Sequence, residues 1–191
     1  MAGKRSLLVA ALMEAAAYPE QTSKVDHIET HVSHLFLTDQ HVYKVKKPVD
    51  FGFLDFTTLR KRYYYCRAEV ALNRRLSPDV YLGVSRITRQ GGGYPVDGSG
   101  RPVEYAVKMR RLPAERALDA LLQRNAVAAE DMQRIARKVA AFHGRAATGP
   151  SITRLGGLAA TRRNVEDKLS ADGAVRGRGV GARGIRRPGR V

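Results

Sequence analysis

Cysteine is nearly absent from the sequence, and long apolar runs are absent altogether. The 191 residues include a single cysteine, Cys66, which excludes a disulfide within the chain and is typical of a reducing compartment. A helix that spans a bilayer needs roughly 20 consecutive apolar residues, and no run in this sequence approaches that length. We therefore expect a cytoplasmic protein that has no membrane partner.

Acidic residues are scarce relative to basic ones. The chain has 18 Asp and Glu against 34 Lys and Arg, which gives a net charge of +16 and a pI near 10.5. A charge of this size attracts polyanionic partners. The rest of the composition is ordinary, with 43% hydrophobic and 27% charged residues, and it predicts a folded domain with a core.

The first 20 residues resemble a secretory signal, because a basic start precedes a run of small apolar residues. Glu14 interrupts that run, however, and Leu8, Leu12 and Ala15 recur at helical spacing. We therefore predict that residues 1–20 form an amphipathic helix that ends at Pro19 and is not an export signal.

The other end of the chain is rich in glycine and arginine and has no aromatic residue. No hydrophobic period there is long enough to fold, so residues 169–191 are predicted to form a disordered tail. GC-rich codons read in a wrong frame give the same composition. We also hypothesise a frameshift or a premature end after Asp167.

Between these ends, strand-like segments surround one long helical segment. Alternation and turn signals predict five short strands in an antiparallel sheet, with one helix packed across it, an α+β arrangement. Two further helices should follow the sheet, the second with an apolar stripe typical of a core. The predicted strands are residues 25–31, 32–37, 41–47, 81–88 and 104–109, and the helices are residues 59–76, 114–123 and 130–143.

The third strand and the long helix are the centre of the functional prediction. Alternation in the strand puts Val42, Lys44 and Lys46 on one face. Glu69 is the only acid in the helix, and no basic residue lies three or four positions from it. A half-buried carboxylate needs a cation from elsewhere, and the strand lysines supply one. If Lys44 and Glu69 pair when partly buried, removal of either should cost about 3 to 5 kcal/mol.

A strand lysine paired with a helix glutamate is the nucleotide-binding arrangement of the kinase N-lobe. The segment VYKVKKPVDFGFLDF, with the later YAVKMRRLP and IARKVAAFHGRA, resembles bacterial aminoglycoside phosphotransferase-like proteins. These proteins are often fused to a C-terminal P-loop ATP-binding domain. The resemblance implies a protein-kinase-like N-lobe over residues 21–112 and the first helices of an incomplete C-lobe over residues 113–168.

The resemblance also implies roles for individual residues in binding ATP. Lys44 matches the lysine that contacts the phosphates, with Lys46 as the alternative, and Glu69 matches its partner on the helix. Val42 shares the face of Lys44, while Met109 and Arg110 lie in the hinge beside the adenine. The loop of residues 31–34 would cover the phosphates, where Ser33 could donate a hydrogen bond. An ordinary polar hairpin is the alternative for this loop, since no G-x-G-x-x-G occurs.

The catalytic parts of such an enzyme are missing from the sequence. Phosphoryl transfer needs an aspartate to orient the acceptor and an Asp/Asn pair to hold magnesium. Asp50-Phe51-Gly52 spells the kinase metal motif, but it precedes the helix, and His143-Gly144-Arg145 has arginine where the catalytic base should be. No P-loop motif occurs either. We therefore expect a catalytically incomplete fragment that retains part of an ATP site, has no magnesium site and lacks the P-loop domain.

Two other functions stay open. One is a basic nucleic-acid-binding protein, suggested by the net charge and by residues 60–65, RKRYYY, which we call the cationic–aromatic cluster. The alternative for this cluster is that its tyrosines pack the helix on the sheet and its charges face solvent. The other function is a regulatory pseudokinase that binds a nucleotide or a partner without chemistry. Without the rest of the C-lobe, the helices after the hinge would also expose an apolar face.

Overall fold

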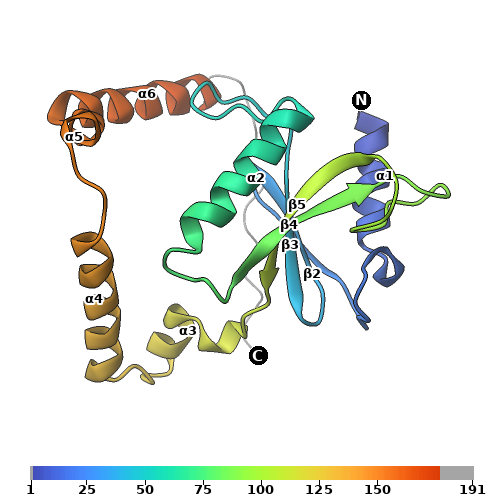
Figure 1. Cartoon of the computed structure of the whole chain (residues 1–191), viewed down its shortest axis with the longest axis horizontal. Helices are drawn as coiled ribbons and strands as arrows, with labels where there is room; N and C mark the ends of the chain where they lie inside the picture. The colour runs from blue at the N-terminus through green and yellow to red at the C-terminus, as the bar shows by residue number, and fades with distance from the viewer. Residues whose placement is uncertain (1, 177–191) are drawn as a thin grey trace. The chain divides into compact units, whose positions relative to one another are not determined.

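A computed structural model describes the backbone of residues 2–176 and the side chains of residues 7–167. The chain divides into two compact units between residues 133 and 134, and the first unit contains the sheet (Figure 1). None of the described helices has the length and apolarity needed to cross a membrane.

Five antiparallel strands form a single sheet, as the sequence predicts, and their order is β1-β2-β3-β5-β4. The first three strands form a meander, and β5 then inserts between β3 and β4, so β3 and β5 are both internal strands. The strands are β1 (Asp26–Glu29), β2 (Ser33–Leu37), β3 (His41–Lys46), β4 (Tyr81–Thr88) and β5 (Pro102–Arg110).

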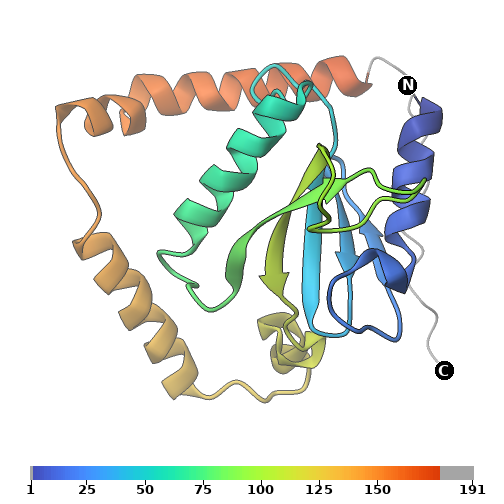
Figure 2. The ribbon, with the colours of Figure 1, turned by 45° about the vertical axis from the view of Figure 1, so that its right-hand side comes forward.

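Two helices cover opposite faces of this sheet (Figure 2). On one face, helix α2 (Leu59–Asn73) packs Cys66 and Val70 against Val107 of β5. On the other face, helix α1 (Ala2–Leu12) contributes to a larger core cluster with β2 and β3. The sheet therefore has a buried interior on both sides, and each strand's alternation assigns its side chains to the α1 face or the α2 face.

The first helix is shorter than predicted. It ends at Leu12, and a 3-10 turn, η1 (Ala15–Ala17), follows before Pro19. The buried hydroxyl of Tyr18 donates a hydrogen bond to the carbonyl oxygen of Leu12 at 2.6 Å. This bond satisfies one of the carbonyls that a helix end leaves without a partner.

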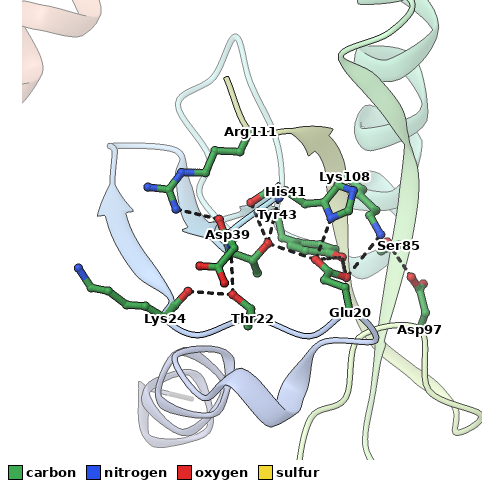
Figure 3. A network of polar contacts seen from close by, with 11 residues as sticks. Glu20, Thr22, Lys24, Asp39, His41, Tyr43, Ser85, Asp97, Lys108 and Arg111 are labelled. Carbon is green, nitrogen blue, oxygen red and sulfur yellow. Dashed lines mark hydrogen bonds and ion pairs between the residues drawn. The ribbon is translucent and has the colours of Figure 1, made fainter. Parts of the chain in front are cut away.

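A polar network ties the segment after η1 to the α1 face of the sheet (Figure 3). The carboxylate of Glu20 accepts hydrogen bonds from the Tyr43 hydroxyl at 2.8 Å and the His41 Nδ1 at 2.9 Å. It also accepts one from Thr38 Oγ1 at 3.2 Å, and Lys108 Nζ lies 3.6 Å away. Glu20 thus joins the N-terminal segment to β3 and β5, a connection that the sequence did not suggest.

The rest of the described chain is helical, with two departures from prediction. The predicted helix over residues 114–123 divides, because the backbone of Ala117 is extended. The helix α6 continues to Arg176, so the predicted disorder does not begin at residue 169, while residues 177–191 lie outside the described part. The elements are η2 (Ala114–Arg116), α3 (Leu118–Gln123), α4 (Ala129–Gly144), α5 (Pro150–Gly156) and α6 (Leu158–Arg176).

The apolar stripe of α4 is not a core in this structure. Met132, Ile135 and Val139 are 48%, 44% and 40% exposed. The expectation that this stripe is buried is therefore wrong for the described residues, whereas the expectation of an exposed apolar face on the helices after the hinge is confirmed.

Candidate nucleotide site

Strand β3 and helix α2 bring the predicted site residues together, and local features of the sequence explain the orientation of the strand and the start of the helix. Strand β3 alternates its side chains, so Lys44 and Lys46 point toward α2. Helix α2 begins after Thr58, whose side-chain oxygen accepts a hydrogen bond from the Lys61 N–H, a normal N-cap. Glu69 lies more than two turns into this helix, where it meets the strand lysines.

Both lysines bind the same carboxylate. Lys44 Nζ lies 2.9 Å from Glu69 Oε1, and Lys46 Nζ lies 2.5 Å from Glu69 Oε2. The predicted pair of Lys44 with Glu69 is therefore confirmed, and Lys46 joins it. The two lysines differ in access, since the side chain of Lys44 is 28% exposed and that of Lys46 only 5%.

Lys46 acts as the buried anchor of this group. Its Nζ also lies 4.9 Å from the centroid of the Phe56 ring, a cation–π contact that stabilises a buried ammonium. Lys44 has three N–H donors, and the only partner found for them among the described residues is Glu69. Lys44 is thus the lysine that can contact a ligand.

The site has an unbalanced positive charge. Burial raises the pKa of the Glu69 carboxyl, but the hydrogen bonds from Lys44 and Lys46 outweigh burial and hold the pKa below its usual value of 4.5. Glu69 is therefore ionised at neutral pH. One carboxylate cannot neutralise two ammonium groups, so the three side chains together attract an anion.

The second lysine changes the expected cost of removing Lys44. Without Lys44, Glu69 still pairs with Lys46, so no buried charge is left alone. We therefore expect a loss of about 0 to 1 kcal/mol, as for a partly exposed ion pair, in place of the 3 to 5 kcal/mol that the sequence suggested. We therefore expect a Lys44 variant to remain folded.

Acid should destabilise the fold, because two partly buried carboxylates, Glu20 and Glu69, have lowered pKa values. Burial also raises the pKa of Glu20, but the hydrogen bonds from Tyr43 and His41 lower it by more, so the net pKa is below the usual 4.5. A carboxyl with a lowered folded pKa adds stability above its unfolded pKa and loses it as the pH falls through the folded value. We expect the free energy of unfolding, measured in urea, to fall steadily below about pH 4.5. A free energy of unfolding that stays constant or rises as the pH falls from about 5 to about 3 would contradict this expectation.

Val42 and Met109 extend the site along the same face of the sheet. They are direct partners in the register of β3 and β5, next to the pair of Lys44 and Val107. Arg110 is the register partner of His41, so alternation puts it on the opposite strand face, away from Lys44. The structure therefore brings Val42 and Met109 to the lysines but not Arg110.

Residues of the predicted hinge border a separate cavity of about 500 Å³. The guanidinium of Arg111 donates to the Thr38 carbonyl at 2.8 Å and to Asp26 at 3.2 Å, which fixes the chain after β5 to the edge of the meander. The lining comes from Arg110, Arg111, Leu112, Pro113, Ala114, Arg116 and Ala117.

Ser33 lies in the sheet and not in an exposed loop. Strand β2 begins at this residue, which is fully buried and is the register partner of Lys46. The turn before it is closed by the Thr30 N–H, which donates to the Ser33 carbonyl at 2.9 Å. The Ser33 hydroxyl has no hydrogen-bond partner among the described residues. A phosphate could reach it only if this turn opened.

The cationic–aromatic cluster does not form one open surface. Lys61 pairs with Asp55, and the Tyr63 ring packs on Tyr105 of β5 with centroids 4.4 Å apart. Arg60, Tyr63 and Tyr64 are exposed, Tyr63 by 37% and Tyr64 by 66%, whereas Arg62 between them is buried. For Tyr63, the alternative that the tyrosines pack the helix on the sheet is therefore correct.

The structure also contains a buried ion pair at the start of α2 that the sequence did not predict. Arg62 Nε donates to both oxygens of Glu104 at 2.9 Å, and Arg62 Nη1 donates to the Phe56 carbonyl at 2.8 Å. Arg62 is 8% and Glu104 5% exposed. Because Arg62, Cys66 and Val70 recur at intervals of four and are the buried residues of α2, this spacing was the signal that Arg62 faces inward.

The residues present do not fit a magnesium site. Within the described part of the chain, no group of three or more His, Cys, Asp or Glu side chains is placed to hold a metal ion. In the Asp50-Phe51-Gly52 motif, Asp50 Oδ1 accepts a hydrogen bond from the Gly52 N–H at 2.9 Å, a local turn contact. No step of the mechanism is therefore assigned to a metal held by this chain.

Comparisons with known proteins add relatives but no activity. The chain is 30% identical over 146 residues to an uncharacterized protein of Mycobacterium bovis and to uncharacterized proteins from two strains of Mycobacterium tuberculosis. The match covers 76% of this chain and 28% of each relative, so the chain spans less than a third of the length of the curated relatives it matches. No family model and no solved structure matches the chain.

Proposed function

We propose that the chain is the ATP-binding part of an aminoglycoside phosphotransferase-like protein, and that Lys44 is the residue that contacts the phosphates. One observation carries the proposal. Two strand lysines share a single helix carboxylate, and the more exposed of the two, Lys44, has donors to spare. This is the strand-to-helix pair that positions a nucleotide in kinase N-lobes.

Each side chain has a separate part in this proposal. Lys46 and Glu69 form the buried base of the site, and Glu69 holds the Lys44 ammonium in place at 2.9 Å. A held ammonium loses less entropy when a phosphate binds than a free one would. The apolar pair of Val42 and Met109 lies farther along the same face, where it can support the base of the nucleotide.

The proposal assigns binding and not catalysis to this chain. Magnesium would arrive with the nucleotide and supply charge neutralisation of the phosphates, as in other phosphoryl-transfer proteins. The residues of this chain bind the phosphates, exclude water from the base of the site and fix the orientation of Lys44. A general base for an acceptor hydroxyl is assigned to none of them.

Thermal unfolding with and without nucleotide tests the proposal. A ligand that binds only the folded state raises the melting temperature. We expect ATP to raise it, ADP to raise it less, and adenosine, which lacks phosphates, to have the smallest effect. The absence of a shift at about 1 mM ATP, the upper end of the usual KM range, would contradict the proposal. Equal shifts from ATP and adenosine would contradict the role of the lysines.

A further inference from the structure

A second cavity lies on the sheet face opposite the candidate nucleotide site. Its volume is about 440 Å³, it is partly open to solvent, and helix α1 and the sheet form two of its walls. Leu8, Val9 and Leu12 of α1 line one side, and Phe36 and Val45 of the sheet line the other. Because Lys44 and Glu69 belong to the α2 face, the two sites are separated by the sheet itself.

The lining of this cavity is mainly hydrocarbon, and its polar side chains are His34, Arg62, Arg89 and Glu104. The buried pair of Arg62 and Glu104 contributes to the lining, but the two side chains are hydrogen-bonded to each other. Arg62 also donates to the Phe56 carbonyl, and Glu104 also accepts from the Tyr105 N–H, so both are already occupied. Arg89 differs from them, since it is exposed and its guanidinium has no partner among the described residues. The cavity thus combines an apolar interior with one available cation at its edge.

We propose that this cavity binds a medium-chain fatty acid, with its hydrocarbon chain between α1 and the sheet and its carboxylate on Arg89. The aliphatic lining favours a hydrocarbon chain, and the volume is within the roughly 300 to 1,000 Å³ of small-molecule sites. An arginine binds a carboxylate by two parallel hydrogen bonds, which favours an acid over an alcohol or an amine. Bound in this way, the fatty acid holds α1 against the sheet.

Chain length gives the first test on the full protein. We expect decanoate to bind saturably, with one molecule per chain, in isothermal titration. Each buried methylene strengthens binding, so octanoate should bind about tenfold more weakly than decanoate. The absence of saturable decanoate binding at concentrations up to about 1 mM would overturn the proposal.

The role of Arg89 gives the second test. The variant Arg89→Gln should weaken decanoate binding about tenfold or more, because it removes a charge-assisted hydrogen bond. Decanol binding should not change. The control Arg86→Gln removes an exposed arginine of β4 that does not line the cavity, and it should leave decanoate binding as in the wild type. Equal weakening by both variants, or no weakening by Arg89→Gln, would overturn the assignment.

A blocking variant separates this site from the nucleotide site. Val103 lines the cavity but is 36% exposed, so Val103→Trp can fill the space with little cost to folding. We expect it to abolish binding of both decanoate and decanol and to leave the effect of ATP on the melting temperature unchanged. Retained decanoate binding in a folded Val103→Trp protein would place the ligand elsewhere and contradict the proposal.

Discussion

Replacement of Arg62 with methionine is expected to lower the free energy of unfolding by about 3 to 5 kcal/mol. Methionine keeps an apolar stem of similar length. The Glu104 carboxylate, which is only 5% exposed, would however lose its cation. The carbonyl of Phe56 loses its donor at the same time. The loss is large against the roughly 5 to 15 kcal/mol that stabilises a typical domain. Urea unfolding followed by circular dichroism measures it.

Two variants make the Arg62 experiment specific. The control Arg60→Met removes an exposed arginine two positions earlier on the same helix and should change stability by less than about 0.5 kcal/mol. The double variant Arg62→Met with Glu104→Gln removes the charge left alone and should recover part of the loss. A cost below about 1 kcal/mol for Arg62→Met would mean that the pair is solvated in solution, contrary to the structure.

The second large effect is expected from Glu69→Gln, at about 3 to 5 kcal/mol. Glutamine has the shape of glutamate and still accepts a hydrogen bond, but it carries no charge. Lys46, 5% exposed on its side chain, would then be a buried cation with no acid beside it. The free energy of unfolding at neutral pH measures the effect.

A matched glutamate is available as the control for Glu69. Glu29 also pairs with a lysine, Lys47, but its side chain is 58% exposed. Glu29→Gln should therefore cost only about 0 to 1 kcal/mol, as expected for a surface ion pair. If both glutamate variants cost the same, Glu69 is not the buried centre of a three-residue group and the description of the site is wrong.

The sequence predicted the parts of the site that depend on local periodicity. Alternation in β3 assigned Lys44 and Lys46 to one face, and the absence of basic neighbours around Glu69 indicated a partner outside its helix. The sequence could not show which of the two lysines is buried and which is exposed to a ligand. Their exposure depends on Phe56 and on the depth of α2 over the sheet, which are set by packing and not by spacing.

Other features could not be predicted because they join distant parts of the chain. The pair of Arg62 and Glu104 spans 42 residues and depends on where α2 crosses β5. Ser33 shows a different limit. Residues 31–34 were expected to form a loop between two strands, whereas the turn closed by Thr30 makes Ser33 the buried start of β2. In both cases tertiary contacts outweigh local preference.

The central claim is that Lys44 contacts the phosphates of a nucleotide, and direct titration of ATP into the wild type and Lys44→Met tests it. Lys44→Met should stay folded, because Lys46 still pairs with Glu69. The control Lys24→Met removes a lysine with a 74% exposed side chain that pairs with Asp26. Loss of a charge-assisted hydrogen bond predicts that ATP binds Lys44→Met about 10- to 100-fold more weakly than the wild type, with Lys24→Met close to the wild type. Equal ATP affinity in the wild type and Lys44→Met, or no ATP binding by the wild type, would contradict the account.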